Sequence, residues 1–214
     1  MNVAEIEIVR TIGSRHTPRT LAQGESLDEM LRAADVIGEL RAARDRGVRT
    51  LLVTASGPGG VLDDSFAIYD ALRAFPSRGG RVVVHVVEEA WSSAVFIALA
   101  GDWIVMDPAA VFVLHAMHGY TEEAHRTANE RVCSIYRERT CTPPEHPDRW
   151  LAQSLAAGPD GDWFEKIPAD ADAWRFGWID EIGNAEYARR VAATGYTTWT
   201  PRQSALIQRR AACG

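Results

Sequence analysis

The chain has 214 residues, of which 46% are hydrophobic, and a formal net charge of −6 at pH 7. This length and composition suit a folded domain with a full core and exclude an intrinsically disordered chain. The acidic balance excludes a surface built for nucleic acid or anionic lipid, which would need a concentrated basic stripe. No apolar run is long enough to cross a bilayer and no secretory signal begins the chain, so we expect a cytoplasmic protein without membrane contact.

The first part of the chain reads as a strand, a helix and a second strand. Residues 5–12 alternate apolar and polar side chains, which predicts a half-buried strand. Ser26 and Glu29 form a capping box, and apolar residues at helical spacing then continue as far as Gly47. The apolar run over residues 48–54 predicts a strand that is buried on both faces.

A glycine-rich turn over residues 56–60 comes next, before a helix at 63–75 and a strand at 81–87. This order is the pattern of a βαβ unit, so the predicted fold class is α/β. The turn lacks the lysine of a P-loop and the spaced glycines of a dinucleotide site. The adjacent pair Gly59 and Gly60 exposes backbone N–H groups, which suits an oxyanion or a closely approaching peptide; the alternative is a tight turn without chemistry.

Residues 92–100 read as an almost wholly apolar helix, which must be buried. Ser92 in its first turn would lie where unpaired N–H groups and the positive end of the helix dipole favour negative charge. The alternative is that Ser92 and Ser93 only cap the helix, as serines at helix starts usually do.

The rest of the chain predicts two short strands, a polar arm and a C-terminal part. Residues 103–106 and 111–114 read as strands, and His115 follows the second. Residues 121–157 form two polar helices around a proline-rich break, which indicates an arm that projects from the core. The remaining predicted elements are an acidic helical turn at 168–177, a strand at 178–182, and helices at 184–194 and 200–212. We expect one domain over residues 1–183, which includes the arm, and a C-terminal helical extension over residues 184–214.

The residue types that point to chemistry are those of an acyl-transfer enzyme. Ser92 or Ser93 is the candidate nucleophile, His115 the candidate base, and an aspartate from elsewhere the third member. Lys166 is the only lysine among 23 basic residues. It follows the turn at 162–164 with no evident route to the serine, which disfavours a Ser–Lys mechanism.

His115, His118 and His125 are close in sequence and are candidate ligands of a metal ion. No cysteine or carboxylate spacing completes a ligand set, so we expect no metal and no other cofactor. The three cysteines are odd in number and scattered among polar residues, so a disulfide framework is not expected either.

Several short motifs, taken in order and spacing, resemble the proteolytic subunit of the Clp protease, and its phage-type members most closely. The motifs are Gly59-Gly60, Phe66 to Asp70, Ala90 to Ala94, Ala100 to Asp102, Val113 to His115, Asp162 to Phe164, and Ala173 to Asp180. The resemblance covers residues 5–182. It implies a ClpP/crotonase-type fold of stacked βαβ units with a projecting helical arm.

The resemblance also implies an activity and the roles of individual residues. It implies a serine endopeptidase that cleaves peptides or unfolded proteins, with Ser92 as nucleophile, His115 as general base and Asp162 as the residue that orients the histidine. Asp160 is the alternative third member. The implied oxyanion hole is made by Gly59, Gly60 and the N–H of Ser93. The family's ring-type assembly implies a homo-oligomer; an ATP-dependent unfoldase partner does not follow, because little sequence precedes the first predicted strand.

Two other functions stay open. Trp91 stands where the family has a small residue just before the nucleophile, and a bulky indole there would narrow the substrate groove. This keeps a catalytically silent assembly subunit as an alternative. A crotonase-type acyl-CoA enzyme would share the glycine-based oxyanion hole, but it would leave the pair of Ser92 and His115 without a role.

Overall fold

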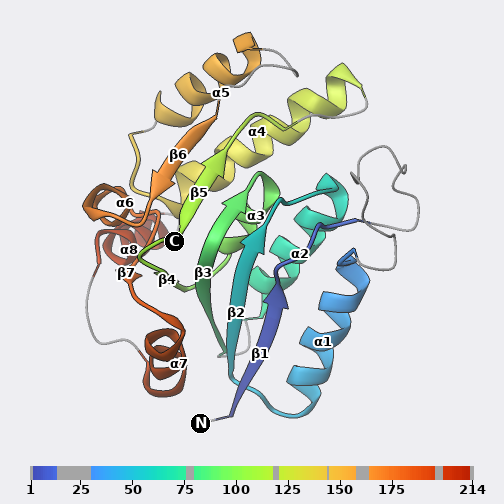
Figure 1. Cartoon of the computed structure of the whole chain (residues 1–214), viewed down its shortest axis with the longest axis vertical. Coiled ribbons are helices and arrows are strands. Elements are labelled where there is room, and N and C mark those ends of the chain that lie inside the picture. The colour runs from blue at the N-terminus through green and yellow to red at the C-terminus, as the bar shows by residue number, and fades with distance from the viewer. Residues whose placement is uncertain are drawn as a thin grey trace.

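The structure is a computed structural model that describes residues 2–13, 30–75, 80–117, 121–143, 145–157, 164–195 and 200–212. A seven-stranded sheet forms its centre, with helices on both faces and a helical arm beyond one end (Figure 1). The main path of the sheet is β1 (Val3–Ile8), β2 (Thr50–Gly57), β3 (Arg81–Trp91), β4 (Trp103–Met106) and β7 (Glu181–Ile182), all parallel. This confirms the α/β fold class with a parallel sheet.

Both faces of the sheet are buried, because alternate residues of each central strand pack on different helices. On one face Leu51 and Val82 pack with α1 (Ala33–Asp45), α2 (Leu62–Ala74) and α3 (Ser93–Ala98) in the main core. On the other face Leu52 and Val83 pack against α7 (Ala185–Thr194). Burial on both sides explains why these strands are continuous apolar runs in the sequence.

β3 changes partner part of the way along its length. Residues Val83 to Val86 pair with β4, whereas Glu89 to Trp91 pair with β5 (Val111–Leu114). The register against β2 shifts between the two halves, and Glu88 adopts a φ of 52° there. A bulge of this kind bends and twists a strand. It turns the last residues of β3 away from β4 and toward the arm.

The arm contains β5, the antiparallel β6 (Glu165–Pro168), α4 (Glu122–Arg139) and α5 (Glu145–Ala157). Aromatic packing joins it to the rest of the chain. The ring of Tyr136 lies 5.5 Å from that of Trp150 in α5 and 5.2 Å from that of Trp178. All three side chains are buried. The predicted arm is therefore present, and its inner surface belongs to the main core.

The last helices lie beside the arm and the sheet. α6 (Ala171–Arg175) is followed by β7, α7 and α8 (Pro201–Ala212). Arg202 of α8 is fully buried and forms an ion pair with Asp180 at 2.8 Å. No helix in the described ranges is both long enough and apolar enough to cross a membrane.

Most predicted elements are present, and the strands at 103–106 and 111–114 have the predicted bounds. Other bounds differ: β1 ends at Ile8 rather than at residue 12, and β3 continues to Trp91 rather than ending at residue 87. α1 begins only at Ala33, because Leu31 forms a β-bridge with Ile12 instead of a helical turn; Ser26 and Glu29 lie outside the described residues. β6 was not predicted as a strand, and the strand predicted at 178–182 is limited to Glu181–Ile182.

Candidate active site

Ser92 lies at the sharp turn between β3 and α3. Its backbone has φ 55° and ψ −122°, a left-handed conformation that is rare outside glycine and is often found at functional sites. Its N–H donates to the carbonyl oxygen of Val113 in β5 at 3.0 Å. Ser92 was expected in the first turn of the helix, but α3 begins one residue later at Ser93. The turn thus presents Ser92 at the end of a buried strand, as the nucleophile turn of hydrolases does.

The glycine-rich turn packs directly on the start of α3. Gly59 has φ 80°, and a Cβ on it would come within 2.8 Å of both the nitrogen and the hydroxyl oxygen of Ser93. Gly60 has φ 150°, and a Cβ there would lie 1.9 Å from the carbonyl oxygen of Ile12. Only glycine fits either position. The predicted neighbours Gly59, Gly60 and Ser93 are therefore brought together beside Ser92.

The backbone N–H groups at this turn differ in their hydrogen-bond acceptors. The Gly60 N–H donates to the Ser93 hydroxyl at 3.0 Å. The Gly59 N–H has no acceptor among the residues that the structure describes. The N–H of Ser93 is the first of α3, and the first N–H groups of a helix have no acceptor within it. Among the described residues, the N–H groups of Gly59 and Ser93 are therefore without an acceptor, whereas the Gly60 N–H is used within the turn.

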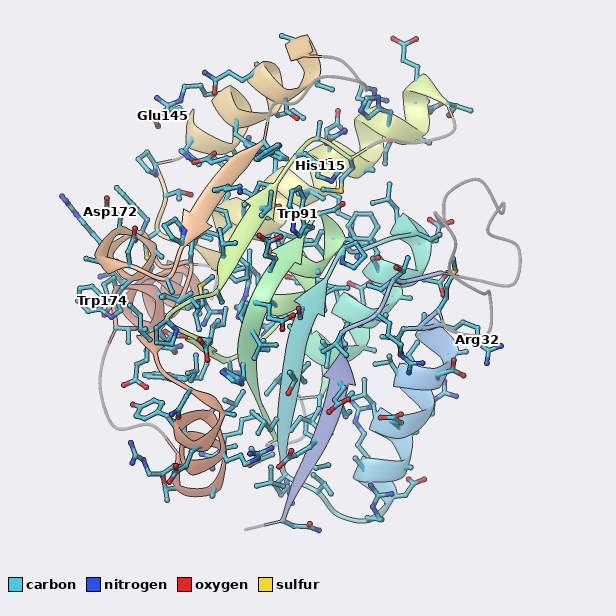
Figure 2. The ribbon with its side chains drawn as sticks, viewed as in Figure 1. Arg32, Trp91, His115, Glu145, Asp172 and Trp174 are labelled. Carbon is cyan, nitrogen blue, oxygen red and sulfur yellow. The ribbon has the colours of Figure 1, made fainter. Side chains whose placement is uncertain are left out.

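His115 directly follows β5, the strand that pairs with the last residues of β3. The pairing of Trp91 with Val113 sets the two segments side by side, and Figure 2 shows Trp91 and His115 near the base of the arm. The Nδ1 atom of His115 lies 2.8 Å from the carbonyl oxygen of Ala116. Since a carbonyl only accepts, Nδ1 carries the proton in this contact and Nε2 is left as the acceptor nitrogen. That tautomer is the one a general base requires.

The segment after His115 is held by the arm. The Ala116 N–H donates to the Ser154 hydroxyl at 2.6 Å. Asn129 accepts from the Met117 N–H at 2.8 Å and donates to the Met117 carbonyl at 2.8 Å. The Ser92 hydroxyl donates to the Met117 sulfur at 3.8 Å rather than to the His115 ring. Ser92 and His115 thus follow the paired ends of β3 and β5, and the serine hydroxyl is directed to Met117.

An aromatic pair borders the site. The rings of Trp91 and Phe164 lie 5.6 Å apart, and the Trp91 Nε1 atom donates to a Glu89 carboxylate oxygen at 2.6 Å. The ammonium of Lys166 lies 5.5 Å from the centre of the Phe164 ring. Lys166 pairs in register with Val113, whose carbonyl accepts from Ser92. The single lysine is thus nearer the site than its sequence position indicates, and its ammonium lies over Phe164.

Some predicted site residues lie outside the described part of the chain. These are Asp162, Asp160 and His118. In the described ranges, no group of three or more His, Cys, Asp or Glu side chains has the arrangement of a metal site. Sequence reasoning missed Met117 and Asn129. Asn129 gave one weak signal, because it is a polar residue on the inner face of an amphipathic helix.

Comparison with known proteins shows where this fold and site belong. Residues 16–186 match the family model described as Clp protease. Two curated relatives are Na(+)/H(+) antiporter NhaA proteins, from Brucella melitensis biotype 1 and from Brucella abortus strain 2308. Each is 31% identical to this chain over 152 residues, which is 68% of this chain and 20% of the relative. The chain spans about a fifth of the length of these relatives.

A solved structure has the same fold. A mutant of ClpP1 from Listeria monocytogenes aligns with a TM-score of 0.64 and 17% sequence identity, over 86% of this chain and 93% of that chain. This confirms the fold that the motifs predicted. Since the family model covers most of the sequence, the chain belongs to the Clp protease family.

Proposed function

We propose that this chain is a serine endopeptidase in which Ser92 attacks a peptide carbonyl, His115 accepts the serine proton and Asp162 orients the histidine. Membership of the Clp protease family supports a peptidase role. The observation that carries the proposal is Ser92 itself. It is held in a left-handed turn at the start of α3, next to the N–H groups of Gly59 and Ser93.

The two N–H groups give the site its electrostatic function. Attack on a carbonyl places a negative charge on the oxygen, and fixed N–H donors stabilise that charge without any reorganisation at the moment of reaction. Each such donor is worth on the order of 3 kcal/mol in a transition state, judged by deletion in other hydrolases. The Ser93 N–H has the added benefit of the helix start, where unpaired N–H groups favour an anion.

Proton transfer requires a small movement of Ser92. Its hydroxyl now donates to the Met117 sulfur, which is a weak acceptor. We propose that in the reactive state the Ser92 hydroxyl gives up this contact and donates to the Nε2 atom of His115, since Nδ1 holds its proton toward the Ala116 carbonyl. Little energy is lost in the exchange, so we expect bound substrate to favour the reactive rotamer.

The choice of Asp162 rests on the motif and on chain connectivity. Asp162 precedes Phe164 by two residues in the sequence. The Phe164 ring contacts Trp91, directly before the nucleophile. Asp160 is two residues further away along the chain and is the alternative third member.

We propose further that the chain acts on peptides or unfolded proteins as a ring-type homo-oligomer in the cytoplasm, without a cofactor. Light scattering and native mass spectrometry test the oligomer, and a monomer that is inactive on short fluorogenic peptides would contradict this part of the proposal. An ATP-dependent unfoldase is not required by the proposed chemistry.

The experiment that tests the nucleophile is labelling with a fluorophosphonate, followed by mass spectrometry of the modified peptide. We expect one adduct, on Ser92, and its loss in Ser92→Ala. The matched control is Ser134→Ala, which removes a half-buried hydroxyl on α4 that donates to Glu138. Label on any other serine, or undiminished label in Ser92→Ala, would contradict the assignment.

A second candidate function is a catalytically silent subunit that serves assembly. The contact of the Ser92 hydroxyl with Met117, together with the indole of Trp91 beside it, favours this alternative. A wild-type protein that forms the oligomer but takes no fluorophosphonate label would support it over the enzyme.

A further inference from the structure

The Ser93 side chain takes part in a chain of hydrogen bonds that joins three segments. The Gly60 N–H donates to the Ser93 oxygen at 3.0 Å, and the Ser93 and Ser65 oxygens lie 2.9 Å apart. The Ser65 hydroxyl also lies 2.8 Å from the carbonyl oxygen of Val61. A hydroxyl has one proton, and a carbonyl only accepts. The Ser65 hydroxyl therefore donates to either the Ser93 oxygen or the Val61 carbonyl, and in both cases the Ser93 oxygen accepts from the Gly60 N–H.

This chain of bonds lies in the core. Both Ser65 and Ser93 have an exposed fraction of 0%. In such surroundings an unpaired polar group is strongly disfavoured, and consecutive hydrogen bonds strengthen one another. The three bonds join the glycine turn, the first turn of α2 and the first turn of α3 into one rigid unit.

The same residue connects this unit to the reaction. Ser93 carries one of the two available oxyanion donors on its backbone, and its side chain holds Gly60, which directly follows Gly59, the residue with the other donor. We propose that Ser93, through its hydroxyl, and Ser65 are positioning residues that fix the distance between the Gly59 and Ser93 N–H groups. This inference rests on the proposed serine-peptidase function of the site.

The kinetic consequence is specific. The two N–H groups act on a charge that exists only in the transition state, so loss of their alignment lowers kcat and leaves KM nearly unchanged. Ser93→Ala removes the acceptor of the Gly60 N–H and frees the turn. We expect kcat on a fluorogenic peptide to fall about 10- to 100-fold, less than deletion of an oxyanion donor would give, with KM within about threefold of wild type.

The kcat of a Ser65→Ala variant gives a second test of the proposal. Ser65→Ala leaves the Gly60 bond to Ser93 in place, so we expect a smaller fall in kcat, about threefold. Since Ser65 acts only through Ser93, the double variant should be no slower than Ser93→Ala alone. Additive losses in kcat would indicate unrelated packing defects and would overturn the proposal.

The matched control is Thr50→Val, which also deletes a buried hydroxyl. Thr50 accepts from the Arg81 Nε atom at 3.1 Å, at the far end of β3 from Trp91, about 30 Å from the site. We expect Thr50→Val to lower stability without a change in kcat. An equal loss of kcat in Thr50→Val and Ser93→Ala would overturn the proposal.

Amide hydrogen exchange at Gly60 separates this inference from the proposed function. In Ser92→Ala, which cannot react, we expect the Gly60 amide to be protected, and Ser93→Ala in that background to speed its exchange about tenfold or more. A Gly60 amide that exchanges freely in the parent protein would overturn the positioning role. A wild type that takes no fluorophosphonate label, yet shows this change at Gly60, would contradict the peptidase and leave the hydrogen-bond chain supported.

Discussion

Replacement of Arg202 by methionine should destabilise the protein by about 4 kcal/mol, within the range for breaking a buried ion pair. Both side chains of the pair of Arg202 and Asp180 have an exposed fraction of 0%, and the bond between them is 2.8 Å long. Methionine fills much of the volume but leaves the Asp180 carboxylate without a countercharge. The Asp180 contacts with the Ile104 N–H and the Thr200 hydroxyl remain, which limits the loss.

Of the three carbonyl groups that accept from Arg202, the Arg139 carbonyl loses its bond from Nε, whereas the other two keep another donor. The Gly101 carbonyl still accepts from Arg139 at 2.8 Å, and the Asp102 carbonyl from Gln203 at 2.6 Å. Burial, and next the charge of Arg202, lower the pKa of Arg139 well below its ordinary value. Removal of Arg202 relieves part of that repulsion. The carboxylate of Asp180 therefore accounts for most of the expected loss.

Urea unfolding at one fixed protein concentration measures the effect, because association of the chain would otherwise shift the midpoint. Asp180→Asn removes the unpaired charge, so in the Arg202→Met background we expect it to recover about 2 kcal/mol. The control is Arg126→Met, which breaks an exposed pair with Glu130 and should change stability by about 0.5 kcal/mol or less. A loss below about 1 kcal/mol in Arg202→Met, or no recovery in the double variant, would refute the reasoning.

Three further predictions concern the site and the core. Asp162→Asn should lower kcat by about a thousandfold or more while Asp160→Asn leaves it near wild type, and the reverse ranking would assign the third member to Asp160. Trp91→Ala should raise kcat/KM for substrates with bulky side chains about tenfold relative to small ones; an unchanged ratio would mean that the indole does not limit the groove. Burial of His85 lowers its pKa from the ordinary 6.5, and the Asp107 carboxylate offsets this only in part. The unfolded chain thus binds the proton first, so this contribution to stability is present above pH 6.5 and is lost as the pH falls through the folded pKa. His85→Phe should flatten the decline of urea stability below pH 6.5, and an unchanged decline would contradict the assignment.

The parts of the fold that were predicted are those set by local pattern. The strands at 103–106 and 111–114 are short apolar runs between turn residues, and their bounds are correct. The α7 helix was predicted to end before Gly195, which has φ 85°, and the structure adds that Asn184 caps its start. In each case the residues that determine the element are neighbours in sequence, so a single sequence is sufficient to predict it.

The parts that were missed depend on contacts between distant residues. β6 has little strand pattern of its own; it is a strand because it pairs with β5. The left-handed backbone of Ser92 follows from the hydrogen bond of its N–H to Val113 and from the glycine turn packed on α3. Neither contact can be predicted from the sequence near Ser92. The use of the Gly60 N–H by the Ser93 hydroxyl likewise joins residues 33 positions apart.

The position of Ser92 depends on α3 as a whole, and α3 has only six residues. A helix of this length has no stability of its own in water, so tertiary contacts must hold it. At its start the Ser93 hydroxyl receives the Gly60 N–H. After its end the buried guanidinium of Arg139 donates to the Leu99 and Gly101 carbonyls, and that of Arg202 also donates to Gly101. Cations suit the negative end of a helix.

Arg139 belongs to the arm helix α4, and Arg202 belongs to the C-terminal helix α8. Both helices lie far from Ser92 in sequence, and neither carries a residue of the proposed triad. Through the end of α3 they nevertheless fix the turn from which Ser92 projects. Changes in the arm or in α8 are therefore expected to reach the nucleophile through a helix of only six residues.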